Sequence, residues 1–148
     1  MNDEILVRRD GEMLRRIECG SNPFYEMVAW PAANVMAIGA GVEVQFVDQD
    51  TADVVSRIAL DGQDQLQDWF GHFGEHPGNA LYVLGWRNVV CINWRLEVEW
   101  VSKNVAVDGI LWVGTSDGRI LLSAEMGPPG GWVPVELDAL TGDLFSRG

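Results

Sequence analysis

Short runs of β-branched, aromatic and aliphatic residues, separated by turn-forming residues, constrain the fold of this chain most. Such runs favour strands, because these side chains fit a pleated, half-buried surface. Asp10-Gly11 separates two of them, and glycine accepts the positive φ that a tight hairpin turn requires. The runs cover residues 4–8, 13–17, 34–40, 42–47, 53–60, 81–84, 89–94, 96–101, 110–113, 120–124, 132–137 and 143–146. The sequence therefore predicts an all-β fold, an antiparallel meander of about 10–12 short strands.

One segment, residues 64–72, has a helical pattern. The positions i, i+3, i+4 and i+7, which share one face of a helix, hold Leu66, Trp69, Phe70 and Phe73. Asp64 is placed to accept backbone N–H groups at the start, and Gly71 or Gly74 can end the helix. The pattern predicts one short helix that packs its aromatic face over a sheet.

The length of 148 residues fits one domain, residues 1–148. The net charge of −12 disfavours binding to nucleic acid or to anionic membranes, because both repel an acidic surface. The longest apolar stretch, residues 27–42, is interrupted by Pro31 and Asn34 and is too short to span a bilayer. The first four residues carry acids where a secretory signal needs basic residues. We therefore expect a cytoplasmic protein.

The two cysteines, Cys19 and Cys91, lie far apart and in strand-like surroundings. They do not form a Cys-x-x-Cys pair, which would indicate redox or metal chemistry. We expect two buried free thiols that act as small hydrophobic residues.

An internal repeat is visible at residues 47–57 and 137–147. Both segments read apolar-Asp-x-x-Thr-small-Asp-apolar-apolar-Ser-Arg. Asp and Thr side chains bond nearby backbone groups, and Gly142 tolerates a left-handed backbone, so the motif predicts a turn that leads into a strand. A looser copy begins at Ile92-Asn93, and residues 10–16 are the candidate for a fourth.

The turn at residues 138–142, with residues 111–120 before it, resembles the blades of β-propellers of the quinoprotein and related type. A propeller usually needs four to eight blades of four strands. Four units in 148 residues leave little room to close one, so a sandwich or barrel is preferred and a reduced propeller-like array is the alternative. Residues 108–110, 117–118 and 125–142 are similar to small uncharacterised bacterial β-rich proteins, a resemblance that implies no activity.

Asp48, Asp50 and Asp53 have the alternating acids of a calcium-binding loop. Such a loop also needs a central glycine for its bend and a bidentate Glu further on, and this segment has neither. We therefore expect these acids to build a turn.

His72, Glu75 and His76 could form a metal or acid–base cluster. His-x-x-x-His places both rings on one face only in a continuous helix, and Gly74 and Pro77 make that helix unfavourable. We expect an exposed polar loop. The sequence predicts no catalytic residue, no metal site and no cofactor.

Seven tryptophans are present, and most of them fit the core of a β-protein. Trp86-Arg87 falls on a connection between strands, and Trp132 follows a glycine pair. Exposed Trp and Arg are favoured interface anchors, so Trp86, Arg87 and Trp132 are the predicted partner contacts.

The first functional hypothesis is a non-enzymatic, acidic protein-interaction module that binds a basic partner, and an immunity-type role is one form of it. The alternatives are a small-molecule or metal-binding β-barrel, or an enzyme of unknown class that uses an aromatic-lined mouth. A component of a larger assembly is a third hypothesis. The sequence leaves the oligomeric state open.

Overall fold

The structure, a computed structural model, describes residues 3–9, 12–20, 25–61, 68–75, 77–127 and 130–147. Within them, fourteen strands form four antiparallel sheets. Sheet 1 pairs β1 (Asp3–Arg9) with β2 (Glu12–Gly20). Sheet 2 contains β3 (Tyr25–Trp30), β4 (Val35–Ala40), β5 (Glu43–Asp48) and β6 (Val54–Ala59). Sheet 3 contains β7 (Phe70–Phe73), β8 (Ala80–Gly85), β9 (Val89–Asn93) and β10 (Val98–Val101). Sheet 4 contains β11 (Ile110–Ser116), β12 (Arg119–Gly127), β13 (Gly131–Asp138) and β14 (Leu144–Arg147).

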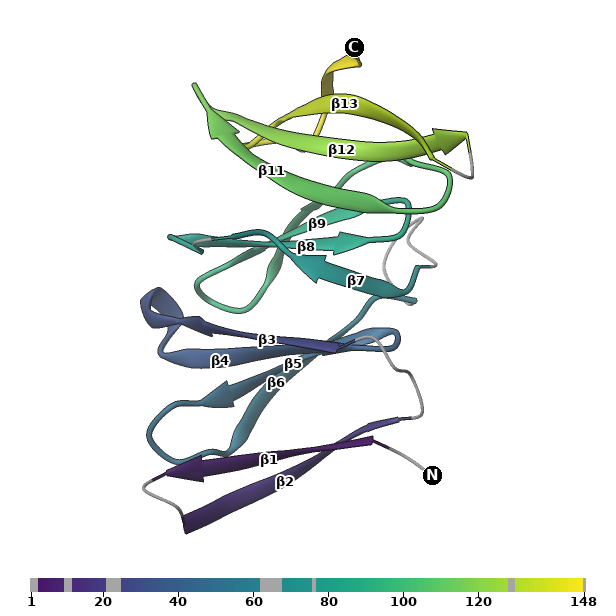
Figure 1. Cartoon of the computed structure of the whole chain (residues 1–148). Helices are drawn as coiled ribbons and strands as arrows, with labels where there is room; N and C mark the ends of the chain where they lie inside the picture. The colour runs from purple at the N-terminus through teal and green to yellow at the C-terminus, as the bar shows by residue number, and fades with distance from the viewer. Residues whose placement is uncertain are drawn as a thin grey trace.

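The sheets are stacked face over face in chain order, and the two termini lie at opposite ends of the stack (Figure 1). Each four-stranded sheet is a meander in which consecutive strands pair. The first strand of one sheet contacts the sheet before it, β7 on β3 and β4, and β11 on β7 and β8. The all-β class is confirmed. Of the predicted arrangements, the propeller-like array is the one observed, and the preferred sandwich or barrel is not.

Sheet 3 explains why the chain forms a stack, because it buries both of its faces. Leu81 and Val83 of β8 lie in a cluster with side chains of sheet 2. Leu84 of the same strand lies in a second cluster with side chains of sheet 4. A strand that is apolar at successive positions needs a neighbour on each face, whereas a two-sheet sandwich covers only one.

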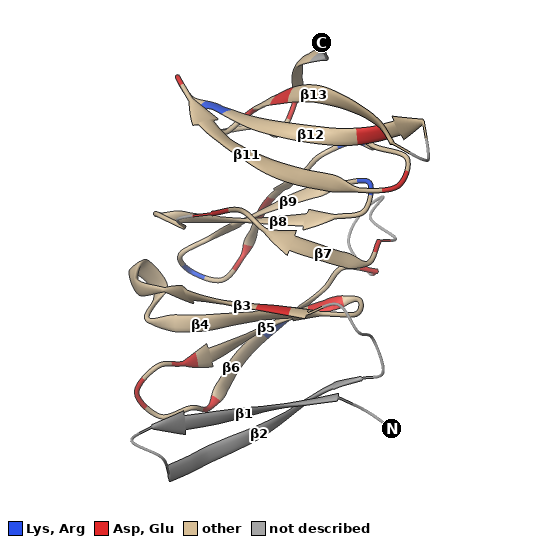
Figure 2. Ribbon diagram, viewed as in Figure 1, with Lys and Arg blue, Asp and Glu red and all other residues tan. Residues whose placement is uncertain are grey.

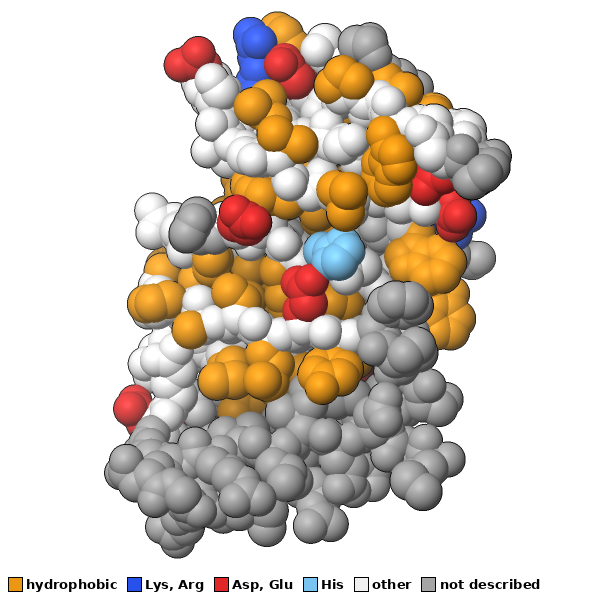
Figure 3. All heavy atoms as spheres, in the orientation of Figure 1, with side chains coloured by type: hydrophobic (Ala, Val, Ile, Leu, Met, Phe, Trp, Pro, Cys, Tyr) orange, Lys and Arg blue, Asp and Glu red, His pale blue; other side chains and the backbone are white. Residues whose placement is uncertain are grey.

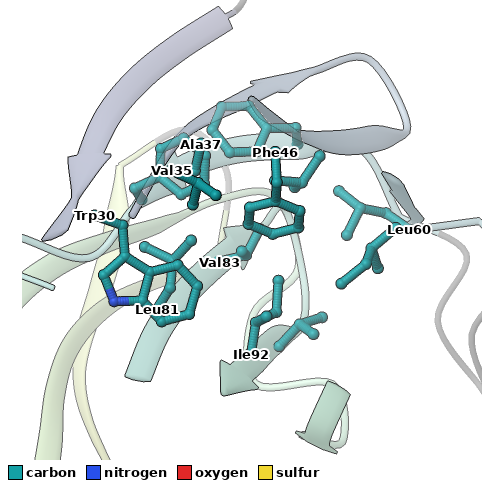
Figure 4. Close-up of a cluster of buried hydrophobic side chains, with 13 residues drawn as sticks. Trp30, Val35, Ala37, Phe46, Leu60, Leu81, Val83 and Ile92 are labelled. Carbon is teal, nitrogen blue, oxygen red and sulfur yellow. The ribbon is translucent and has the colours of Figure 1, made fainter. Parts of the chain in front are cut away.

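The cluster between sheets 2 and 3 contains the largest buried side chains (Figure 4). Sheet 2 and its connections contribute Trp30, Val35, Ala37, Phe46 and Leu60, and sheet 3 contributes Leu81, Val83 and Ile92. The Trp30 indole also donates a hydrogen bond of 2.7 Å from Nε1 to the carbonyl oxygen of Gly78, so its one polar atom is satisfied in the core.

The helix predicted for residues 64–72 is wrong over residues 68–72, and residues 64–67 lie outside the described part. Asp68 and Trp69 are irregular, and β7 begins at Phe70. The pairing with β8 shifts between Phe70 and His72, and Phe70 and Phe73 are both buried. Because of this bulge, Phe70 and Phe73 lie on the same face of the strand although they are three positions apart, and this spacing is also typical of one face of a helix. The described helical structure is one 3₁₀ turn, Pro31–Ala33.

The turns at residues 48–53 and 138–143 have matching hydrogen bonds from side chain to backbone. In the first copy, Asp48 Oδ1 accepts from the backbone N–H groups of Asp50 and Thr51, at 2.8 and 2.9 Å. In the second copy, Asp138 Oδ1 accepts from Leu140 and Thr141, at 2.8 and 3.3 Å. In both copies the Thr hydroxyl accepts from the second Asp N–H at 3.2 Å. The acids of these segments build turns, as predicted.

The looser third copy uses Asn93 in place of Asp. Asn93 Oδ1 accepts from the N–H groups of Arg95 and Glu97 at 2.9 and 3.1 Å. Each of the three turns joins the third and fourth strands of its sheet. Each four-stranded sheet therefore contains one turn of this kind. Residues 10 and 11 lie outside the described part, but β1 and β2 pair on either side of them as predicted.

The left-handed position of the turn gives a test of this equivalence. Gly142 has φ +77° and Ala52, its counterpart, has φ +64°. A Cβ on Gly142 would overlap the Trp100 ring, so Gly142→Ala is expected to lower the free energy of unfolding by about 2 kcal/mol or more. Ala52→Gly is expected to be neutral or stabilising, by up to about 1 kcal/mol. Urea denaturation measures both, and equal effects would contradict the assignment.

Cys91 is a buried free thiol, as predicted, whereas the Cys19 side chain lies outside the described part. Burial, and secondarily the nearby Glu99 carboxylate, raises the pKa of Cys91 to about 12. Since the thiolate is the reactive form, iodoacetamide at neutral pH is expected to leave Cys91 unmodified in the folded chain and to alkylate it after denaturation. Peptide mass mapping measures this, and alkylation of the native chain within minutes would contradict it.

The same pKa shift predicts a dependence of stability on pH. In the unfolded chain the thiol ionises near its ordinary pKa of 9.0, whereas in the folded chain it stays protonated up to about 12. The free energy of unfolding is therefore unaffected by this thiol below pH 9, and it falls as the pH rises from 9 toward 12, because only the unfolded chain loses the proton there. Cys91→Ala is expected to remove this part of the alkaline decline.

Candidate binding groove

A groove of about 310 Å³ lies between sheets 3 and 4. Its walls come from β7, from the turn between β8 and β9, from the segment that leads into β11, and from β13. The lining residues are Gly71, His72, Gly85, Trp86, Asp108, Gly109, Ile110, Leu111 and Trp132. We name this the Trp86–Trp132 groove.

Trp86 and Trp132, two of the predicted partner contacts, both line this groove although they are 46 positions apart in the chain. Their exposed fractions are 38% and 42%. A Cβ on Gly109 would lie 3.4 Å from Trp132 Cη2, so the indole ring rests against this glycine. Arg87, the third predicted contact, is not among the lining residues. Its Nε lies 3.9 Å from Asp68 Oδ1.

The turn that carries Trp86 is fixed by Asp68. This carboxylate is only 2% exposed, and its Oδ2 accepts from the backbone N–H groups of Arg87 and Asn88 at 2.8 and 3.1 Å. Gly85 makes room for it, because a Cβ there would overlap the carboxylate. The turn closes with a bond of 2.8 Å from Gly85 N to Asn88 O. Trp86 is therefore presented on a rigid support.

One wall of the groove is tied to sheet 2 by Glu26 of β3. Its Oε1 lies 2.5 Å from His72 Nδ1, and its Oε2 accepts from Phe73 N at 3.0 Å. His72 thus pairs with an acid from a distant strand and not with Glu75. His76 lies outside the described residues. Within the described part, three or more potential metal ligands do not gather at any point.

Asp108 lies in the connection between β10 and β11, and its side chain is exposed. Backbone bonds hold this connection against β12, from Val107 N to Glu125 O at 2.8 Å and from Glu125 N to Gly109 O at 2.9 Å. Among the described residues, none donates a hydrogen bond to the Asp108 carboxylate or forms an ion pair with it. The Asp108 carboxylate can therefore accept a hydrogen bond or an ion pair from a ligand in the groove.

A second groove between the same two sheets, of about 540 Å³, is lined by Tyr82, Trp94, Arg95, Glu99 and Trp100, among others. Its groups are largely paired with one another. Arg95 lies over the Trp94 ring at 5.1 Å, and Glu99 accepts from Asn93 Nδ2 at 2.8 Å. Burial raises the pKa of Tyr82, whose ring lies 6.1 Å from that of Trp100. We therefore consider the Trp86–Trp132 groove the better candidate site.

The surroundings of the site are apolar and acidic. In Figure 3, hydrophobic side chains surround the exposed histidine, and an acidic side chain lies directly beside it. Acidic residues lie in many of the turns and strand ends, whereas basic residues are few (Figure 2). Within the described residues, no helix is long and apolar enough to cross a membrane.

Stacked four-stranded antiparallel meanders, each contacting the next through its first strand, resemble the blades of a β-propeller. Among solved structures, the chain is similar to the crystal structure of BamB from Moraxella catarrhalis, with a TM-score of 0.66 and 12% sequence identity. The match covers 93% of this chain and 43% of BamB, so the chain spans less than half of that protein. No family model and no curated protein matches the sequence. The likeness shows the fold alone, and it agrees with the predicted resemblance to propeller blades. The resemblance of the C-terminal quarter to small bacterial proteins stays a prediction.

Proposed function

We propose that this chain is a non-enzymatic protein-interaction module whose propeller-like blades present the Trp86–Trp132 groove to a partner protein. The observation that carries the proposal is the position of these two half-exposed indoles in one groove. Tryptophan is enriched among the residues that dominate binding energy at interfaces. The rigid turn around Asp68 supports such a role, because a fixed anchor loses little entropy on binding.

The partner we propose is basic. The net charge of −12 favours association with a positively charged surface and speeds the encounter at low salt. An immunity-type role, in which the chain masks a basic effector, is one form of this function. A cytoplasmic location stays a prediction.

Affinity capture from native lysate tests the proposal, with wild type compared to the double variant Trp86→Ala/Trp132→Ala. The variant is expected to retain at least about tenfold less of the partner, since losing two anchors costs more than losing one. Trp94→Ala is the matched control, because Trp94 is 53% exposed but lines the other groove. Equal retention by wild type and the double variant would overturn the proposed site. Binding that does not weaken with salt would overturn the electrostatic part.

A second candidate function is small-molecule binding, which the groove volume of about 310 Å³ favours. A thermal-shift panel of divalent metals and common metabolites distinguishes the two functions, because a ligand that binds only the folded chain raises the melting temperature. A rise of several degrees with one compound, absent in Trp86→Ala/Trp132→Ala, would favour the second candidate.

A further inference from the structure

The Trp86–Trp132 groove combines two kinds of group that bind cations. The face of an indole ring attracts a positive charge more strongly than any other side-chain ring. The Asp108 carboxylate adds a charged acceptor in the same groove. The three side chains line one groove, so a cation bound there would lie close to both kinds of group.

Among the residues that the structure describes, no lysine or arginine lines this groove. Arg87 is next to Trp86 in sequence, but its guanidinium lies near the buried Asp68 and does not line the groove. His72 does line the groove, and its Nδ1 is paired with Glu26.

Two other exposed rings, those of Trp94 and Phe145, each lie against an arginine. The Arg95 guanidinium lies 5.1 Å from the centre of the Trp94 ring, and that of Arg119 lies 3.4 Å from the centre of the Phe145 ring. Among the described residues, Trp86 and Trp132 have no such cation. A cation from outside the chain would therefore not compete with any of these residues for the two rings.

We infer that the Trp86–Trp132 groove binds a lysine or arginine side chain of the partner protein, held against the indole rings and the Asp108 carboxylate. This inference rests on the proposed function and names the chemistry that the partner supplies. Charge complementarity argues for a protein as the source, because the whole chain carries −12 and attracts a basic surface around the inserted side chain.

NMR titration with a defined peptide tests the inference. The probe is acetyl-Gly-Gly-Arg-Gly-Gly-amide, and its control is the same peptide with citrulline, which has the shape of arginine without the charge. The arginine peptide is expected to shift the indole Nε1–H signals of Trp86 and Trp132 and to leave that of Trp94 unchanged. The citrulline peptide is expected to bind at least about fivefold more weakly, since only the charged group gains from the rings and the carboxylate.

Two variants divide the contributions. Trp132→Leu is expected to abolish the shift at Trp86, and Asp108→Asn is expected to weaken arginine-peptide binding at least about threefold while leaving citrulline-peptide binding unchanged. Trp94→Leu is the control and is expected to bind the arginine peptide like wild type. Unchanged signals from the remaining tryptophans verify that each variant is folded.

The outcomes separate the inference from the proposed function. Equal binding of the arginine and citrulline peptides overturns the inference, while partner capture that depends on the two tryptophans upholds the proposed function. Charge-dependent peptide binding, with a partner that the Trp86→Ala/Trp132→Ala variant captures as well as wild type does, upholds the cation chemistry of the groove and overturns the proposed function at this site. Tetramethylammonium binding as tight as that of the peptide assigns the groove to a small cation and overturns the inference. Signals of Trp86 and Trp132 that shift with protein concentration alone assign it to a second copy, which also overturns it.

Discussion

Gly39→Ala is expected to lower the free energy of unfolding by about 3 kcal/mol, near the upper end of the usual cost of overpacking a core. Gly39 lies on β4, where a Cβ would overlap the ring of Phe70 on β7. Phe70 is fully buried and tilted against Phe73, with 4.8 Å between ring centres, so the ring cannot move aside without disturbing a second one. Sheets 2 and 3 would have to separate locally.

Urea denaturation of wild type and four variants measures this effect, and the four include Phe70→Leu alone. Gly114→Ala is the matched control, because Gly114 also lies in a strand and a Cβ there meets no atom within 4 Å. It is expected to change stability by less than about 0.5 kcal/mol. In Gly39→Ala/Phe70→Leu the smaller leucine makes room for the added methyl group. The double variant is therefore expected to lose less free energy of unfolding than the two single variants lose together. Additive losses would show that the glycine does not serve the contact with Phe70.

Asp68→Ala is the second large effect, with an expected loss of about 3 kcal/mol in the free energy of unfolding, because backbone donors lose a charged acceptor. Asp68 Oδ2 accepts from Arg87 and Asn88, and its Oδ1 accepts from the N–H of Trp69 at 2.9 Å. The turn that carries Trp86 would loosen, so affinity for the proposed partner should fall about tenfold even though Asp68 does not line the groove.

Denaturation and hydrogen exchange at the Arg87 and Asn88 amides measure the two parts of this prediction. Asp61→Ala is the control, since Asp61 is an exposed acid outside the turn, and it should cost less than about 0.5 kcal/mol. Faster exchange at both amides in Asp68→Ala is expected. Full partner affinity in a variant with that faster exchange would contradict the role of the turn in presenting Trp86.

Features of this fold that depend on neighbours in sequence could be predicted. The turns at residues 48–53 and 138–143 follow from Asp and Thr side chains that bond their own backbone, and the structure confirms both. The strand β3 was missed, although Tyr25–Trp30 alternates in burial, because its sequence runs into the 3₁₀ turn at Pro31 without a hairpin signal. The predicted helix over residues 68–72 was wrong because pairing with β8 sets the geometry of β7, and a local pattern of apolar residues does not contain that information.

The candidate site depended on residues far apart in sequence. Trp86 and Trp132 were predicted separately as exposed anchors, but only the packing of sheet 4 on sheet 3 puts them in one groove. The Glu26–His72 pair joins residues 46 positions apart, and no local pattern indicated it. The continuous apolar residues 81–84 contained the signal for a strand buried on both faces, which would have favoured a stack over a sandwich.

The one-dimensional order of the sheets has a consequence for how the chain comes apart. Sheet 3 separates sheets 2 and 4, and the two hydrophobic clusters on its faces are distinct. In such an array stability is a sum of the stability of each unit and of the interface to its neighbour, and the loss of one interface leaves the next intact. Local opening can therefore detach sheet 2 or sheet 4 alone, while sheet 3 is held from both sides. The groove, built where sheet 4 meets sheet 3, forms and disappears with that single junction.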